Sequence, residues 1–248
     1  MTLPNWVFFM GDDLGRSIYL QPFHPWEPLI LAVPLVLLRR RGKSAGYLVC
    51  FSLFFCYMWA VCHYAVAPLP VDRELIDWMR EVQTWDERVN LRLHLVPQVL
   101  ERWGHYEIEG NLLLGVPFGL GFPFVAAARH RTAVRGIGLC FAFAASLELI
   151  QLAISLFIYG FPYRSIDIED VIFVFAGALF GYAVFRLGAA VYGLLRWSGG
   201  ARVPVWDHFH EVLLSVTSAR GASRPGAPAR EGEPGKSTGD TPMPTADA

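Results

Sequence analysis

Long apolar segments constrain this chain more than any other feature of its sequence. A helix needs about 20 apolar residues to cross the hydrocarbon core of a bilayer. Four segments have that length and character, and they cover residues 46–67, 108–128, 134–160 and 168–195. Of all residues, 54% are hydrophobic and only 17% are charged. A soluble domain of this size is more polar, so the sequence predicts an all-α, polytopic membrane helix bundle.

Two of the apolar segments contain helix-breaking residues. Segment 108–128 includes glycines together with Pro117 and Pro123, so we expect a kinked helix whose freed backbone groups are satisfied by neighbouring helices. A shorter segment, 23–38, contains three prolines and Glu27. It either spans with its prolines near one end or is re-entrant. Counting it, we expect about five transmembrane helices.

Basic loops predict the orientation of the bundle, because cytoplasmic loops carry an excess of Lys and Arg. Residues 39–43 read Arg-Arg-Arg-Gly-Lys and residues 129–135 contain three arginines, whereas the region 72–109 is rich in acids. We therefore expect 39–43 and the C-terminus to be cytoplasmic and 164–170 to face outward. The N-terminus would lie outside if the first segment spans.

The sequence divides into five regions around these segments. Residues 1–67 form an N-terminal membrane hairpin, 68–107 an outward-facing amphipathic loop, 108–195 a core with three spans, 196–217 a cytoplasmic interfacial helix, and 218–248 a disordered tail. The tail is rich in Gly, Pro and Ser and almost lacks large apolar residues, so it cannot bury enough surface to order itself. The two amphipathic regions have apolar residues at helical spacing: Leu75, Trp78, Met79, Val82, Val89 and Leu93, and Val205, Trp206, Phe209, Val212, Leu213 and Val216.

Polar residues within the spans are the main candidates for a site. Glu148 and Gln151 are three residues apart, so they share one helical face, and an acid at membrane depth usually marks function. Asp167 and Asp170 begin the last span. Either Asp167 caps that helix or both acids join a site with Glu148. Arg164 could neutralise one of these acids or grip an anionic group of a ligand.

Small residues predict which helices meet. Gly115 and Gly119 lie four apart, as do Gly177 and Gly181. Faces of this kind allow close approach of membrane helices. We therefore expect the helix at 108–128 to pack on the last span, which would bring Asn111 near Glu148.

Several of these residues, in this order and spacing, resemble the VanZ-like family. The similarity covers roughly 90–187 and rests on Asn111-Leu112-Leu113-Leu114-Gly115-Val116-Pro117-Phe118-Gly119, on Glu148 and Gln151, and on Arg164, Asp167-Ile168-Glu169-Asp170 and Gly177-Ala178-Leu179-Phe180-Gly181-Tyr182. The chain departs from the family where Val174 replaces a usual Asn. The resemblance implies an integral protein of a bacterial cytoplasmic membrane whose namesake is linked to resistance to teicoplanin, a lipid-bearing glycopeptide.

Our leading hypothesis is an outward-facing binding site for an amphiphile or a cell-envelope headgroup. Its expected residues are Asn111, Glu148, Gln151, Arg164, Asp167 and Asp170. The expected partners are membrane lipid and a cell-envelope precursor or lipoglycopeptide, with no nucleic acid and no cofactor; a homo-oligomer is left open.

Three other functions stay open at this stage. In a membrane enzyme acting on a lipid-linked or cell-wall substrate, Glu148 would be a general base and the two aspartates would orient substrate or hold a divalent cation. In a purely structural protein, the polar residues would satisfy one another. A transporter is less favoured, because the short-looped helices show no clear inverted repeat.

Overall fold

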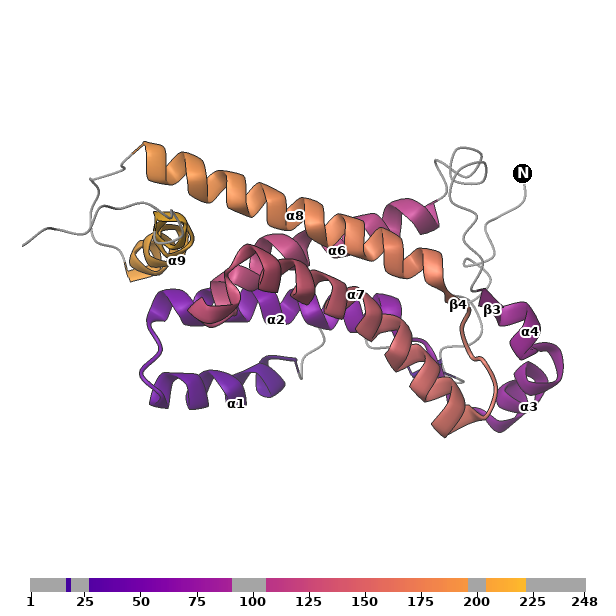
Figure 1. Cartoon of the computed structure of the whole chain (residues 1–248). Helices are drawn as coiled ribbons and strands as arrows, with labels where there is room; N and C mark the ends of the chain where they lie inside the picture. The colour runs from indigo at the N-terminus through magenta and orange to yellow at the C-terminus, as the bar shows by residue number, and fades with distance from the viewer. Residues whose placement is uncertain (1–16, 19–26, 91–105, 196–203, 222–248) are drawn as a thin grey trace, which may run out of the picture.

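Four long helices form the body of the molecule (Figure 1). The computed structural model describes residues 17–18, 27–90, 106–195 and 204–221. The long helices are α2 (Ala45–Ala65), α6 (Tyr106–Val125), α7 (Ala133–Ile154) and α8 (Ile168–Leu194), and α7 continues into a π-helical turn, η3 (Ser155–Tyr159). All four are long and apolar enough to cross a membrane. Their ends lie within about one helical turn of the predicted ends, which confirms the predicted bundle.

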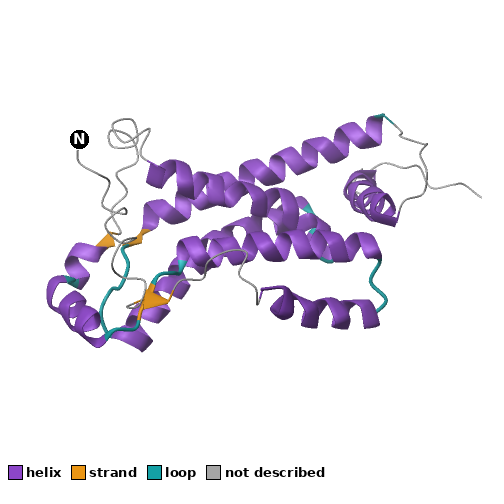
Figure 2. Ribbon diagram, turned by 180° about the vertical axis from the view of Figure 1, so that it is seen from behind, coloured by secondary structure: helices purple, strands orange, loops and turns teal. Residues whose placement is uncertain are grey.

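The first apolar segment forms the shorter helix α1 (Glu27–Arg40). It has 14 residues, and at about 1.5 Å per residue it is shorter than a bilayer core of about 30 Å. It packs beside α2 (Figure 2). Within the described residues the bundle therefore has four helices of spanning length, where about five were predicted. Residues 23–26 of the predicted segment lie outside the described residues.

Helices α6 and α8 make the closest contact in the bundle. A Cβ atom at Gly115 would meet the backbone of Val174 and Ala178, and one at Gly177 would meet the carbonyl oxygen of Leu112. Gly119 and Gly181 approach the facing backbone in the same way. The predicted packing of these two helices is confirmed. It requires glycine at these positions, because glycine has no Cβ atom to keep the two backbones apart.

Helix α6 continues unbroken through Pro117 and Pro123. One turn before Pro117, the hydroxyl of Tyr57 on α2 donates a hydrogen bond of 2.6 Å to the carbonyl oxygen of Leu114. Pro117 removes the N–H that would donate to the carbonyl oxygen of Leu113, four residues earlier, so the bond from Tyr57 ties α2 to α6 beside the proline without satisfying the freed carbonyl. That a neighbouring helix satisfies the freed carbonyl stays a prediction.

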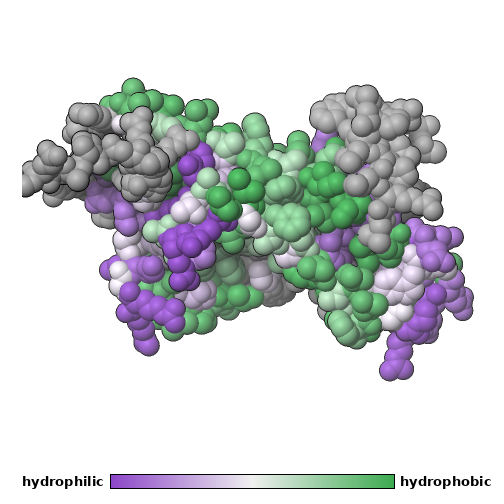
Figure 3. Space-filling model, viewed as in Figure 1, coloured by the Kyte–Doolittle hydropathy of each residue, from purple (hydrophilic) through white to green (hydrophobic). Residues whose placement is uncertain are grey.

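The two ends of the bundle carry different short elements. At one end lie α3 (Arg73–Val82) and α4 (Trp85–Arg88) with two small sheets; β1 (Ser17–Ile18) pairs antiparallel with β2 (Leu69–Pro70), and β3 (Val89–Asn90) pairs parallel with β4 (Ile166–Asp167). At the other end lie the 3-10 turn η2 (Ala128–His130) and α9 (Pro204–Gly221). We call these the α3 end and the α9 end. Figure 3 shows hydrophobic residues over the middle of one face and hydrophilic residues toward both ends.

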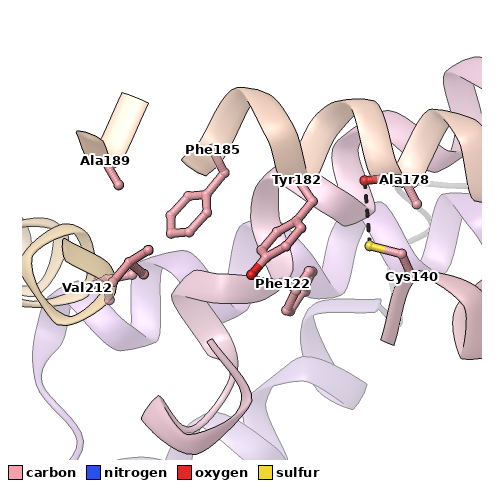
Figure 4. Packing of buried hydrophobic residues seen from close by; sticks show 8 residues of the cluster. Phe122, Cys140, Ala178, Tyr182, Phe185, Ala189 and Val212 are labelled. Atoms are coloured by element: carbon pink, nitrogen blue, oxygen red, sulfur yellow. Dashed lines mark hydrogen bonds between the residues drawn. The ribbon is translucent and has the colours of Figure 1, made fainter. Parts of the chain in front are cut away.

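Part of the predicted interfacial face of α9 packs on protein. Val212 and Val216 are buried in a cluster with Phe122, Tyr182 and Phe185 (Figure 4). Trp206, by contrast, is 67% exposed. Helix α9 is thus a component of the bundle core, with only part of its apolar surface left to meet lipid. Most of the predicted disordered tail, 222–248, lies outside the described residues.

Helix α3 likewise divides its apolar residues between protein and surface. Leu75 and Met79 are buried against Tyr159, Phe161 and Tyr163, while Trp78 and Val82 are exposed. Of the two remaining predicted residues of this face, Val89 lies in β3 and not on the helix, and Leu93 lies outside the described residues. The loop between η3 and β4 is held down by this aromatic cluster.

Buried polar side chains seal the α9 end. Arg131 is 8% exposed, and its guanidinium donates to the carbonyl oxygens of Pro123 and Ala126 and to Oγ of Ser215. These carbonyls belong to the end of α6, where the backbone lacks its own donors. Arg131 therefore both caps α6 and fastens α9.

A tyrosine and a histidine extend this seal. The hydroxyl of Tyr182 on α8 lies 3.2 Å from the carbonyl oxygens of both Arg131 and Thr132. Nε2 of His208 on α9 lies 2.9 Å from the carbonyl oxygen of Phe124. His208 thus links α9 to the end of α6, whereas Tyr182 links α8 to the backbone just before α7.

Candidate functional site

The C-terminal end of α2 is capped by side chains from α7 and from the loop before α8. Nε2 of Gln151 donates to the carbonyl oxygen of Ala65 over 2.7 Å. The hydroxyl of Tyr163 donates to that of Val66 over 3.0 Å, and Nη1 of Arg164 to that of Ala67 over 2.7 Å. The last carbonyls of a helix have no partner within it. Gln151 and Arg164, predicted as ligand-binding residues, therefore have a structural contact that accounts for part of their polarity.

Asn111 and Asp170 join α6 to α8 beside this cap. Nδ2 of Asn111 donates to Oδ1 of Asp170 over 2.6 Å. The close packing of the glycine faces brings the two helices near enough for this short bond. Asp170 belongs to the first turn of α8, where a carboxylate is favoured by the helix dipole.

Asp167 is the N-cap of α8. Its Oδ1 accepts a hydrogen bond of 2.9 Å from the backbone N–H of Glu169, which confirms the capping alternative predicted for this residue. Its Oδ2 accepts a bond of 3.1 Å from Nδ2 of Asn90. Asn90 pairs with Asp167 in the parallel β3–β4 sheet, so the sheet holds the cap in place.

Glu148 lies among these groups and differs from them. The charges of Asp170, Asp167 and Arg164 act on its carboxylate, and the backbone of Asp167 lies within hydrogen-bonding reach. Its Oε2 is buried and has no hydrogen-bond partner among the described residues. The structure thus gathers all six predicted residues at the α3 end. Among these six, Glu148 and Gln151 each keep one buried side-chain oxygen without a hydrogen-bond partner in the described residues, but Gln151 is anchored through its amide nitrogen.

Two residues of this region were not predicted as site residues. Asn90 and Tyr163 both contact predicted residues or the same cap. Burial raises the pKa of the Tyr163 hydroxyl to about 12, so this group stays protonated and remains a hydrogen-bond donor. The resemblance loosely included Asn90, whereas no sequence pattern distinguishes Tyr163 from other interfacial tyrosines.

The family comparison matches the region that contains this arrangement. A model of the family described as VanZ/LLP1 matches residues 54–190. The chain belongs to the VanZ/LLP1 family. No curated protein and no solved structure matches it.

The matched region includes all six predicted site residues. It also includes most of α2, the elements of the α3 end except β1, and α6 to α8 up to residue 190. This VanZ/LLP1 protein is a multi-pass membrane protein, given its four helices of spanning length.

The side chains at the α3 end of this VanZ/LLP1 protein are suited to hydrogen bonding more than to metal binding. Among the residues that the structure describes, no group of three or more His, Cys, Asp or Glu side chains has the arrangement of a metal site. The predicted alternative in which Asp167 and Asp170 hold a cation gains no support from this geometry. Carboxylates that already accept bonds from Asn90 and Asn111 are better described as fixed acceptors around Glu148.

Proposed function

We propose that this VanZ/LLP1 protein binds the polar headgroup of an amphiphile at its α3 end. The α3 end is the outward-facing side of a bacterial cytoplasmic membrane in this proposal. The described parts of the acid-rich segment, 72–90 and 106–109, lie at the opposite end of the bundle from the basic loops 39–43 and 129–135, which supports that orientation. By occupying or remodelling lipid near cell-wall precursors, the protein would lower susceptibility to lipoglycopeptides such as teicoplanin.

The observation that carries the proposal is the unpartnered Oε2 of Glu148. Leaving a buried carboxylate oxygen without a donor is costly, and the cost is greatest where water is scarce, as in a membrane span. Asn111, Asp167 and Arg164 each have protein contacts that explain their positions. Glu148 has an oxygen to spare, so it is the residue that a ligand donor would meet.

The test compares drug susceptibility in a sensitive Gram-positive host. The host expresses the wild type, the variant Glu148→Gln, or the control Glu109→Gln, all at equal folded levels. Glu109 is an exposed glutamate on α6 and is not one of the proposed site residues, so its variant removes the same charge at an exposed position. We expect the wild type and Glu109→Gln to raise the inhibitory concentration of teicoplanin more than that of vancomycin, and Glu148→Gln to lose this effect.

Two outcomes would contradict the proposal. If Glu148→Gln protects as well as the wild type, Glu148 does not contribute to the protective site. If Glu148→Gln mainly lowers folded yield and the wild type protects against neither drug, the polar residues serve the bundle alone. Conversion of a lipid-linked substrate by purified protein, lost in Glu148→Gln, would favour the enzyme alternative instead.

A further inference from the structure

Three oxygen atoms on one face of α7 and the start of η3 have no hydrogen-bond partner within the described residues. They are Oε2 of Glu148, Oε1 of Gln151 and Oγ of Ser155, and all three are buried. Spacings of three and four residues place these side chains in one row along the helix. Gln151 is 6% exposed and Ser155 is 0% exposed, so neither oxygen is placed to bond bulk water. We call this row the α7 polar stripe.

The local backbone could satisfy Ser155 but does not. Ser146, on the same helix, donates its hydroxyl to the carbonyl oxygen of Phe143 over 2.7 Å, the usual solution for a helical serine. The hydroxyl of Ser155 makes no such bond. At this residue α7 changes into the π-helical turn η3, and π-helical turns occur frequently at functional sites. Ser155 is therefore held with both its donor and its acceptor unused.

The oxygen atoms of the α7 polar stripe favour ligand groups that donate hydrogen bonds. Carboxylate and amide oxygens only accept hydrogen bonds, and the amide nitrogen of Gln151 already donates to the carbonyl oxygen of Ala65. Asp170 and Asp167 add negative charge next to Glu148. A hydroxyl or ammonium group would satisfy these acceptors, whereas a phosphate or carboxylate would be repelled by them.

We propose that the α7 polar stripe binds hydrogen-bond donors of the ligand, and that Ser155 is a binding residue at its far end. The ligand class is an amphiphile with a hydroxyl-bearing or ammonium-bearing headgroup. This inference rests on the proposed function, because it specifies the ligand of the same site. Glu148 is the least buried of the three residues, so a headgroup meets it first and reaches Gln151 and Ser155 next.

The experiment uses the full chain in nanodiscs of phosphatidylcholine, whose headgroup has no N–H or O–H donor. Glucosyl-diacylglycerol, phosphatidylethanolamine or phosphatidic acid with the same acyl chains is added in a dilution series, and retained lipid is measured by native mass spectrometry. The proteins are the wild type, Glu148→Gln, Ser155→Ala and the matched control Ser146→Ala. Ser155→Cys replaces Ser155→Ala if the latter does not fold.

We expect the wild type to retain the glucosyl or ethanolamine lipid in preference to phosphatidic acid. Loss of one hydrogen bond in Ser155→Ala should weaken that retention about two- to tenfold, and Ser146→Ala should leave it unchanged. Preference for phosphatidic acid would overturn the inference. So would equal retention by Ser155→Ala and Ser146→Ala, which would assign the hydroxyl of Ser155 to internal water instead.

The same experiment separates this inference from the proposed function. Retention that depends on Glu148 but favours phosphatidic acid would support a headgroup site and contradict its donor selectivity. Retention of none of the three lipids would contradict both.

Discussion

At both ends of the bundle, side chains of neighbouring elements contact backbone carbonyl oxygens near a helix end, but the two ends differ in how many buried polar atoms keep no partner. At the α9 end, Arg131 and His208 contact backbone carbonyl oxygens at the end of α6, and Tyr182 contacts those of Arg131 and Thr132 just before α7. At the α3 end, Gln151 and Arg164 do the same for α2. Within the described residues, every buried side-chain oxygen or nitrogen without a hydrogen-bond partner belongs to an element that reaches the α3 end; these atoms are on His63, Gln83, Glu148, Gln151 and Ser155.

This difference separates polar side chains whose hydrogen bonds stabilise the fold from polar side chains that still have atoms free to bond a ligand. Arg131 places three donors on three acceptors, so the α9 end is saturated. At the α3 end the acceptors outnumber the donors around Glu148, because Asp167 and Asp170 are acceptors too. The proposed site therefore differs from the α9 end in its surplus of hydrogen-bond acceptors, and not in burial alone.

The largest expected effect comes from disrupting the glycine contact between α6 and α8, the two helices that run between the ends. A valine at position 177 would force its side chain into the carbonyl oxygen of Leu112 on α6. We expect Gly177→Val to lower the free energy of unfolding by at least about 3 kcal/mol, measured by steric trapping in bicelles. The control is Gly188→Val on the same helix, where an added Cβ meets nothing within 4 Å; equal losses in the two variants would show that the backbone contact is unimportant.

Removing the buried cation should damage the saturated end. Arg131→Met loses all three hydrogen bonds of the guanidinium and leaves the carbonyl oxygens of Pro123 and Ala126 without these donors. We expect a loss of about 2–4 kcal/mol in the free energy of unfolding and faster hydrogen exchange in α9. Arg135→Met, at an exposed arginine, should change stability by less than about 0.5 kcal/mol. Unchanged exchange in α9 would rule out the fastening role of Arg131.

A pair of serine variants compares the two ends directly. Ser215 accepts a bond from Arg131 and donates to the carbonyl oxygen of Val212, so Ser215→Ala should cost about 1–2 kcal/mol of unfolding free energy. The hydroxyl of Ser155 has no hydrogen-bond partner among the described residues, so in pure phosphatidylcholine bicelles Ser155→Ala should cost nothing or stabilise the protein. A cost for Ser155→Ala equal to that of Ser215→Ala would erase the distinction between the ends.

The smallest effect concerns pH at the capped end of α2. Burial raises the pKa of Tyr163 to about 12, against about 10 in an unfolded chain. Between these values the unfolded chain releases the proton first, so this contribution to stability is complete below about pH 10 and is lost as the pH rises toward about 12. Near neutral pH, the free energy of unfolding of the wild type should be about 1 kcal/mol higher than that of Tyr163→Phe. This difference should shrink above pH 10. A constant difference in unfolding free energy across this range would contradict the assignment.

The features predicted well from sequence are those that depend on local pattern. The spans follow from apolar length, the contact of Gly115 with α8 from residues four apart, and the N-cap at Asp167 from its position before an apolar run. Each of these signals is contained within a few turns of one helix. The shortness of α1 is the exception, since prolines and Glu27 made that segment ambiguous.

The features that were missed depend on distant parts of the chain meeting. Asn90 reaches Asp167 across 77 residues, and Arg131 reaches Ser215 across 84. In the sequence Arg131 belongs to a basic loop, yet in the structure it is buried and one of its hydrogen-bond partners is Ser215 of α9. Ser155 looks like an ordinary helical serine, because nothing in the sequence shows that its hydroxyl is left without a partner.

The glycine contact also determines which parts of the bundle can move. Where the backbones of α6 and α8 touch at Gly115, Gly119, Gly177 and Gly181, sliding one helix along the other would drive backbone atoms together, so the pair behaves as a single rigid spine. The loop before β4 and the π-helical turn η3 are not part of this spine. Glu148 belongs to α7, so any widening that would admit the proposed headgroup requires α7 to shift relative to this spine.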